Sequence, residues 1–138
     1  MWTCPKCQRP FRRKSAWHIC NEKTVDEIFA DAPDNVLLAF DDVLVATAGW
    51  EPNTLSAGRH AAMLSNVRVW LVLRPARRWL DLQFYTARPL TSAQLHRSGP
   101  YSKKSTRKFV HVIRLYGGGE LTEEQVDLLR EGYRYAES

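Results

Sequence analysis

Four side chains that bind metal ions well lie within the first twenty residues, with the spacing C-x2-C-x10-H-x-C. They use all three cysteines of the chain and its first histidine. Three thiolates and one imidazole form a closed set of four ligands, which suits a tetrahedral structural Zn²⁺. Pro5 fixes one φ angle inside the Cys-x-x-Cys turn and helps both sulfurs face one point. The spacing therefore predicts a zinc finger over residues 1–22 with the ligands Cys4, Cys7, His18 and Cys20.

Other uses of these cysteines fit the pattern less well. A redox Cys-x-x-Cys normally opens a helix after a strand, whereas this one begins three residues from the start. A disulfide would leave one cysteine over, and no signal peptide suggests export. His18 and Cys20 do not share a helix face because they are two residues apart. We therefore expect a turn or an extended segment there, not the helical histidine pair of a DNA-reading finger.

Length and composition predict one compact domain beside the finger. The chain has 138 residues, of which 44% are hydrophobic, as in an ordinary globular protein. No apolar run reaches the roughly 18 residues of a membrane-spanning helix. We therefore expect a cytoplasmic protein, without a membrane segment, made of a finger over 1–22 and a second domain over 23–138.

Charge alternates along the chain. Residues 1–20 carry five basic residues and no acid, and residues 21–51 carry eight acids and one Lys. Residues 52–119 carry twelve basic residues and only Asp81, and residues 120–138 carry six acids and two Arg. One explanation is mutual neutralisation within the fold. The other is a basic surface, built from the finger and the central segment, that attracts a polyanion.

Two helices are predicted between the finger and the strands. Thr24-x-x-Glu27 is a capping-box pattern ahead of an apolar turn. Pro33 suits the first turn of a longer helix that runs to about Ala48, and Gly49 ends it. Apolar side chains recur in this helix at spacings of three and four: Val36, Leu37, Phe40, Val43, Leu44 and Thr47.

The central segment is rich in β-type runs, and a helix follows it. The predicted strands are Arg59–Leu64, Val67–Leu73, Trp79–Thr86 and Arg107–Tyr116. Three glycines then break the chain, and Thr122-x-x-Gln125 is a second capping box that opens a helix through Tyr133. This order predicts an α+β fold, with an antiparallel sheet of about four to five strands and helices on one face.

Alternation along these strands separates a covered sheet face from an open one. The expected covered side is apolar: Leu80, Leu82, Phe84, Phe109, Ile113 and Leu115. The other side mixes aromatic, basic and polar residues: Arg68, Trp70, Val72, Trp79, Asp81, Gln83, Tyr85, Lys108, Val110, Val112, Arg114 and Tyr116. Such a face could stack unpaired bases, each worth about 1–3 kcal/mol. The alternatives are a partly covered face with Trp as filler, or a dimer contact.

The chain resembles small bacterial proteins that join an N-terminal zinc finger to a domain of unknown function. The family's finger pattern matches here at Trp2, Cys4, Pro5, Cys7, Arg9, Phe11, His18 and Cys20. Its strand and helix patterns match at Arg59, Leu80, Asp81, His111, Arg114, Leu115 and 123–136. Gln8 and His60 depart from the family pattern, but neither is a metal ligand. The resemblance implies zinc and this architecture, and it brings no established activity.

Enzyme activity is the less favoured reading of the sequence. A two-metal nuclease needs several converging carboxylates, and the central segment offers Asp81 alone. No Gly-x-Ser-x-Gly motif is present, and all cysteines are assigned to metal. Alternation places His111 on the core side, where a buried, hydrogen-bonded histidine is expected. The alternative is a binding or acid–base role for His111 near Tyr101, Arg88 or Lys108, in a pocket that uses Arg88 and His111.

The favoured function is binding of nucleic acid with weak base specificity, since phosphate contacts from Lys and Arg read no sequence. The expected contacts come from the finger and a basic loop: Arg9, Arg12, Arg13, Lys14, Lys103, Lys104, Arg107 and Lys108. The alternative is a protein-interaction or small-anion-binding module. The direction in which the central basic residues project distinguishes the two readings.

Overall fold

The computed structural model describes residues 1–5, 10–15, 24–119 and 121–138. Two short strands, β1 (Trp2–Thr3) and β2 (Pro10–Phe11), pair antiparallel. Helices α1 (Val25–Ile28) and α2 (Asp34–Thr47) follow, and α3 (Glu123–Glu137) comes last. Between α2 and α3 lie six strands: β3 (Thr54–Ala57), β4 (Ala62–Ser65), β5 (Val69–Pro75), β6 (Leu80–Thr86), β7 (Leu95–Pro100) and β8 (Phe109–Leu115).

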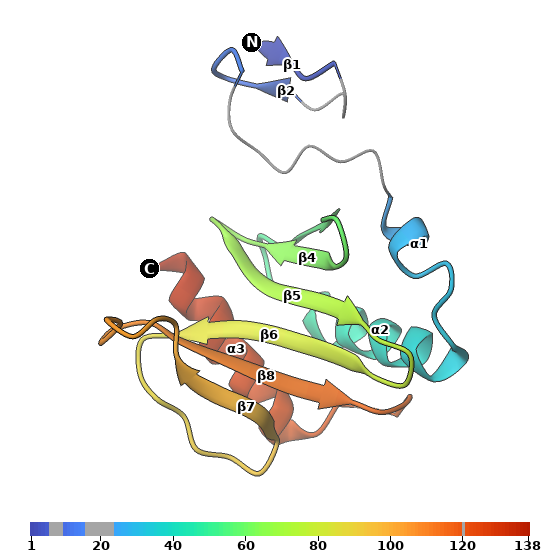
Figure 1. The fold of residues 1–138 in the computed structure, drawn as a ribbon, viewed down its shortest axis with the longest axis vertical. Helices are drawn as coiled ribbons and strands as arrows, with labels where there is room; N and C mark the ends of the chain where they lie inside the picture. The colour runs from blue at the N-terminus through green and yellow to red at the C-terminus, as the bar shows by residue number, and fades with distance from the viewer. Residues whose placement is uncertain (6–9, 16–23, 120) are drawn as a thin grey trace.

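These six strands form one antiparallel sheet in the order β3-β4-β5-β6-β8-β7. Helices α2 and α3 lie on the same side of it, behind the sheet in Figure 1, and leave the other face toward the viewer. The predicted α+β class and antiparallel sheet are therefore confirmed. The expected number of four to five strands is wrong, because β3 and β7 were not foreseen.

The two unforeseen strands are the edges of the sheet. Strand β3 has only four residues, and β7 contains His96, Arg97, Gly99 and Pro100. Short length, charge and proline are the features by which natural proteins protect sheet edges from further pairing. The same features remove the apolar alternation from which a strand is recognised in a sequence.

Side-chain caps set the starts of α1 and α3. The Thr24 hydroxyl accepts a hydrogen bond from the backbone N–H of Glu27 at 3.2 Å. At α3 both hydrogen bonds of the capping box form. The Gln125 backbone N–H donates to the Thr122 hydroxyl at 3.1 Å, and the Thr122 backbone N–H donates to the Gln125 side-chain oxygen at 3.0 Å. Both capping patterns thus start helices as predicted. Pro33 is the N-cap of α2 and lies one position before its first turn.

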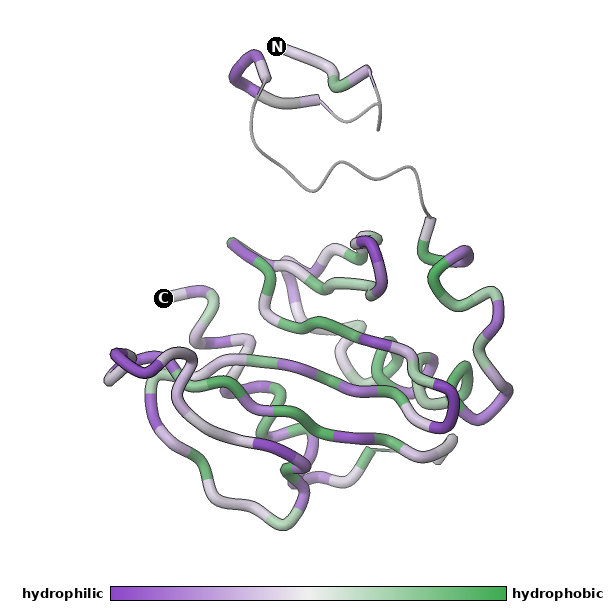
Figure 2. The backbone as a smooth tube through the Cα atoms, in the orientation of Figure 1, coloured by the Kyte–Doolittle hydropathy of each residue, from purple (hydrophilic) through white to green (hydrophobic). Residues whose placement is uncertain are grey.

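The core lies between the sheet and the helices. Along β6 the side chains alternate between full burial and partial exposure, as a strand with one covered face requires. Figure 2 shows this alternation as changes of colour along the central strands. The covered face contributes Leu71, Leu73, Leu80, Leu82, Phe84, Ile113 and Leu115, which pack with Val36, Phe40, Val43 and Leu129 of the helices.

Trp70 departs from the alternation. The register between β4 and β5 pairs Ser65 with Val69 but Leu64 with Leu71, so Trp70 is the extra residue of a β-bulge. The bulge turns its side chain to the helix side, where it is 1% exposed and lies 5.4 Å from the Tyr133 ring. Its indole N–H donates to Asn53 at 2.9 Å. The prediction that Trp70 lies on the open face is therefore wrong.

Arg68 is also on the helix side. Its guanidinium donates to the backbone oxygens of Ala136 at 3.0 Å and Ser138 at 2.5 Å. A cation at the C-terminus of a helix satisfies carbonyl groups that have no partner within the helix. Its predicted place on the open face is wrong because the bulge at Trp70 interrupts the alternation there.

The helices of the described residues are too short or too polar to cross a membrane.

Candidate functional site

The strand register builds the open face of the sheet in rows. Arg74, Asp81 and Arg114 are directly opposite one another on β5, β6 and β8, so their side chains share a face. In the adjacent row, Val112 of β8 pairs with Gln83 on one side and Arg97 on the other. Charged and polar side chains from four strands are thereby brought together on the open face of the sheet, which no helix of the described residues covers.

Arg114 organises one end of this face. Its guanidinium makes two hydrogen bonds to the Asp81 carboxylate, at 2.8 and 3.2 Å. The same guanidinium lies 4.0 Å from the ring centroid of Trp79, and the Trp79 and Tyr116 rings meet edge to face at 6.0 Å. The hydrogen bond to Asp81 raises the pKa of Arg114, so its positive charge is permanent. The result is a cation held against an aromatic surface.

A second aromatic and cationic cluster lies at the other end. The Lys108 ammonium is 4.8 Å from the ring centroid of Tyr85 and 4.1 Å from that of Tyr101. These two rings pack edge to face with centroids 5.9 Å apart. The Gln83 amide donates to the Tyr85 hydroxyl at 2.8 Å. Cation–π contacts of this kind are worth about 0.5–1 kcal/mol each at exposed sites.

The open face thus has four cations and one carboxylate among the described residues. The cations are Arg74, Arg97, Lys108 and Arg114, and the carboxylate is Asp81. Four aromatic rings lie between or beside them: Trp79, Tyr85, Tyr101 and Tyr116. Tyr101 and Tyr116 are 55% and 64% exposed, so their rings are available to a ligand. Such a surface suits an anion that also carries flat aromatic groups.

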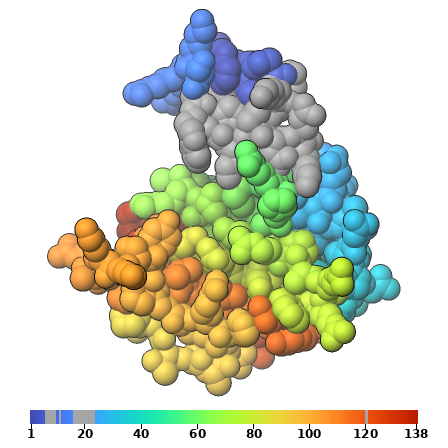
Figure 3. All heavy atoms as spheres, viewed as in Figure 1, coloured from blue at the N-terminus to red at the C-terminus, as the bar shows by residue number. Residues whose placement is uncertain are grey.

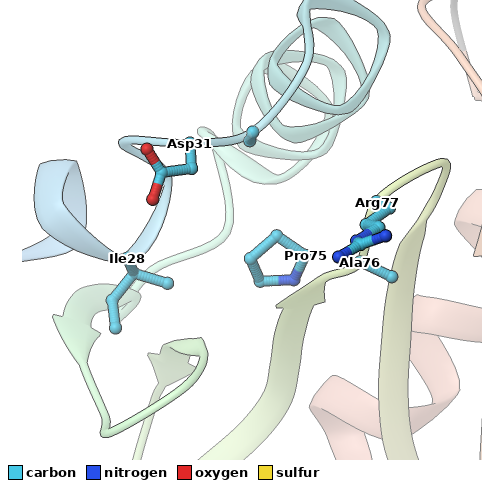
Figure 4. A pocket seen from close by; sticks show the side chains of 6 residues that line it. Ile28, Asp31, Pro75, Ala76 and Arg77 are labelled. Atoms are coloured by element: carbon cyan, nitrogen blue, oxygen red, sulfur yellow. The ribbon is translucent and has the colours of Figure 1, made fainter.

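Two hollows flank this region. One, of about 350 Å³, lies beside Arg114 and Tyr116 at the start of β7. The other, of about 280 Å³, lies between the α1–α2 segment and the β5–β6 turn. Figure 4 shows Asp31 and Arg77 on opposite sides of Pro75 in that second hollow. One acid and one base give it no charge preference, so of these two hollows the first extends the basic face.

The predicted basic loop forms the turn between β7 and β8. Ser102 and Ser105 close it: the Ser105 N–H donates to the Ser102 carbonyl at 3.0 Å, and their hydroxyls are 2.9 Å apart. Figure 3 shows this loop projecting from the side of the molecule. Lys103, Lys104 and Arg107 are exposed on it, and Lys108 is half-buried at its base. The loop therefore continues the cationic surface beyond the sheet.

The predicted zinc ligands are described only in part. Cys4 is buried, 4% exposed, just after β1. Cys7, His18 and Cys20 lie outside the described residues, as does the predicted contact Arg9. Arg12, Arg13 and Lys14 are described and exposed. The four-ligand site therefore stays a prediction.

His111 is buried, as the alternation predicts, and it is part of a hydroxyl network. Thr86 Oγ1 donates its one proton to the Arg88 carbonyl at 2.6 Å, so it accepts from His111 Nε2 at 2.7 Å. Nδ1 then accepts from the Ser98 hydroxyl at 2.6 Å. Burial lowers the pKa of His111, against an opposing effect of Glu131. The ring is therefore neutral at pH 7, with its proton on Nε2.

Arg88 does not turn its side chain to this histidine. Its guanidinium makes two hydrogen bonds to Glu131 of α3, at 3.1 and 2.7 Å. Thr86 connects the two residues, since its hydroxyl contacts the Arg88 backbone and the His111 ring. Arg88 and His111 thus have separate partners, and an anion would have to displace one of them to reach either side chain.

Sequence reasoning missed two residues of the open face, Arg74 and Arg97, and considered Tyr101 only as a neighbour of His111. Arg74 directly follows the predicted strand end at Leu73, and one more residue of strand would have included it. Arg97 belongs to the unforeseen edge strand β7, and Tyr101 follows that strand's end. Since β7 has no apolar alternation, no signal in the sequence identifies the face of Arg97.

Comparison with known families gives one match. A family model described as "Domain of unknown function (DUF5655)" matches residues 25–136, from α1 to α3. No curated protein and no solved structure matches the chain. The matched segment contains the whole six-stranded sheet with its open face, and it leaves β1 and β2 outside. The chain therefore belongs to the DUF5655 family of domains of unknown function.

Proposed function

We propose that this protein binds single-stranded nucleic acid across the open face of its sheet. The observation that carries the proposal is the excess of four cations over one carboxylate on that face, interleaved with four aromatic rings. Cations attract the phosphate backbone, and aromatic rings stack on unpaired bases. A duplex keeps its bases stacked internally, so single strands use both features and duplexes use only the first.

The loop between β7 and β8 would extend the phosphate contacts. Its cations Lys103, Lys104 and Arg107 are exposed and continue from Lys108 at the sheet. The finger would add Arg9, Arg12, Arg13 and Lys14. Phosphates and base planes are common to DNA and RNA and to all sequences, so the proposal predicts weak specificity.

The proposal includes a zinc finger over residues 1–22 beside the domain of residues 23–138. The donor set of Cys4, Cys7, His18 and Cys20 fits a structural zinc ion, since three thiolates and an imidazole fill a tetrahedral shell. The burial of Cys4 is consistent with a ligand rather than a reactive surface thiol. Thiolate ligands persist in a reducing compartment, so we place the protein in the cytoplasm.

Salt-dependent binding tests the role of the sheet. Binding of a labelled single strand and the matching duplex is measured by fluorescence anisotropy from 20 to 300 mM salt. The slope of log affinity against log salt is negative. The double variant Arg74→Ala/Arg97→Ala should make it shallower by about 1.4, at about 0.7 per lost phosphate contact on a single strand. Arg88→Ala is the matched control, because it removes an exposed cation paired with Glu131 on the helix side.

The contribution of the finger is tested in the same assay. Replacing Arg12, Arg13 and Lys14 together with Ala should make the salt slope shallower by about two to three units, and it should weaken binding of all nucleic-acid sequences alike. The control exchanges the same residues for the other cation, Arg→Lys and Lys→Arg, which keeps the charge. No binding to any nucleic acid at low salt would overturn the proposal and favour a protein-interaction or small-anion-binding module.

A further inference from the structure

The end of the sheet has a pocket of about 280 Å³ that the function proposed above leaves unused. The pairing of β5 with β6 stops at Leu71 and Phe84, while β6 continues to Thr86 along β8. Beyond Phe84 the bulge at Trp70 carries β5 away from β6. In Figure 1 the C-terminal turns of α3 are visible between the start of β5 and the end of β6. The pocket lies in this opening.

The wall of the pocket is aromatic and cationic. Its lining includes Arg68, Trp70, Tyr85, Lys108, Gly132 and Tyr135, and none of its described lining residues is acidic. Gly132 contributes no side chain, and an added Cβ there would lie 2.9 Å from Phe84 Cδ2. The glycine therefore brings α3 close to β6. A volume of about 280 Å³ is near the lower end of the roughly 300–1,000 Å³ usual for small-molecule sites, so it suits one small group.

Two groups of the pocket are able to receive a ligand. Within the described part of the chain, Lys108 has no carboxylate partner, and its ammonium lies over the Tyr85 and Tyr101 rings. The Tyr85 hydroxyl accepts from Gln83, so its own proton remains for an acceptor on a ligand. Arg68, in contrast, is already bonded to the end of α3.

We infer that this pocket binds one nucleotide, with its base against Tyr85 and Tyr135 and its phosphate on Lys108. The inference rests on the proposed function, because Tyr85 and Lys108 belong both to the open face and to the pocket. A strand that follows the face would reach the pocket at its end. The nucleotide comes either from that strand or from a free nucleoside monophosphate, since both offer a base and a phosphate.

Two variants change the pocket and keep every cation of the open face. Tyr135→Ala removes an aromatic wall, and Tyr135→Phe is its control because it keeps the ring. Val69 also lines the pocket and is 37% exposed, so Val69→Trp should narrow the pocket and disturb little of the core. A thermal unfolding curve of each variant shows whether it folds, and Val69→Trp tests the inference even if Tyr135→Ala does not fold.

The probes are a single-stranded 12-mer and the four nucleoside 5′-monophosphates, titrated by calorimetry. Loss of one stacked base should weaken the 12-mer about 5- to 150-fold in both pocket variants, with an unchanged salt slope. Arg74→Ala/Arg97→Ala should instead make the salt slope of 12-mer binding shallower and leave any monophosphate binding intact.

The outcomes separate the two sources and the two hypotheses. Monophosphate binding that both pocket variants abolish supports a free nucleotide as ligand, even if the 12-mer fails to bind. A weakened 12-mer without monophosphate binding supports a nucleotide of the strand. If the wild type binds the 12-mer and both pocket variants match it, with no monophosphate binding, the inference is overturned and the proposed function stands. If no probe binds the wild type, both are overturned.

Discussion

The Arg114 guanidinium lies 4.0 Å from the ring centroid of Trp79 while it donates two hydrogen bonds to Asp81, at 2.8 and 3.2 Å. One carboxylate therefore both orients the cation over the ring and neutralises part of the charge of the open face. Both members of the ion pair are about one-fifth exposed, at 20% each. Arg114 is near enough to the surface for its positive charge to act on a bound polyanion once Asp81 no longer balances it.

Removing that carboxylate should strengthen binding of nucleic acid. Asp81→Asn keeps the shape of the side chain and leaves Arg114 without a counter-charge, so phosphates meet one more net positive charge. We expect tighter binding at low salt and a salt slope steeper by about 0.7 for single strands. The matched control is Glu131→Gln, which frees Arg88 on the helix side and should leave binding unchanged. An affinity of Asp81→Asn equal to that of the wild type would exclude the Arg114 end of the face from the interface.

Aromatic residues of the open face should distinguish single strands from duplexes. Trp79→Ala or Tyr116→Ala should weaken single-strand binding by about 1–3 kcal/mol per lost stacked base and affect the duplex much less. Trp70→Ala is the contrasting variant: Trp70 is buried, so its truncation should lower the free energy of unfolding by about 3–5 kcal/mol. Anisotropy titrations and denaturant unfolding give the two readouts. Equal losses on both kinds of nucleic acid would mean that the rings do not stack on bases.

The parts of the fold that could be predicted are those in which local chemistry and tertiary structure agree. Thr122 and Gln125 form the capping box that their spacing predicts, and strand β6 alternates along its whole length. Trp70 could not be placed, because a bulge depends on how two strands meet and shifts the alternation by one residue. The edge strand β7 was missed because the charged residues, glycine and proline that protect a sheet edge leave no apolar alternation in its sequence.

The residues of the candidate site also fall into those that could be predicted from local sequence and those that could not. Asp81 and Arg114 were placed on one face from alternation within single strands, and the register confirms that they are opposite each other. Arg97 joins them through the pairing of β7 with β8, and β7 has no periodic pattern from which this pairing could be predicted. The pocket beside Gly132 arises from a bulge, a strand end and a helix together, so no single stretch of sequence contains its signal.

The first twenty residues should hold one zinc ion per chain. Elemental analysis of freshly purified protein should find zinc, and X-ray absorption should place sulfur and nitrogen ligands about 2.0–2.3 Å from it. Cys4→Ser should lose the metal and loosen residues 1–22, with cooperative unfolding of the larger domain retained. Ser15→Ala, at an exposed position of the same segment, is the control and should keep the metal. Zinc-free wild-type protein would contradict the prediction.

Buried His111 should make the free energy of unfolding depend on pH. Above pH 6.5 the His111 ring is neutral in both the folded and the unfolded state. As the pH falls through 6.5, the ring is protonated in the unfolded chain first, because burial lowers its pKa in the folded protein. Stability should therefore fall between pH 7 and 5, by at most about 1.4 kcal/mol per pH unit from this group. The change should stop below the lowered pKa, where both states are protonated.

Denaturant unfolding at pH 5, 6, 7 and 8 measures this dependence. His111→Gln, which removes the titrating group and keeps a side chain able to hydrogen-bond, should lower stability at pH 7 and flatten the curve below it. His96→Gln is the control, since it removes an exposed histidine from the neighbouring strand β7. If His111→Gln loses as much stability between pH 7 and 5 as the wild type, other groups account for the acid sensitivity. The hydroxyls of Thr86 and Ser98 would then stabilise the charged ring as well as the neutral one.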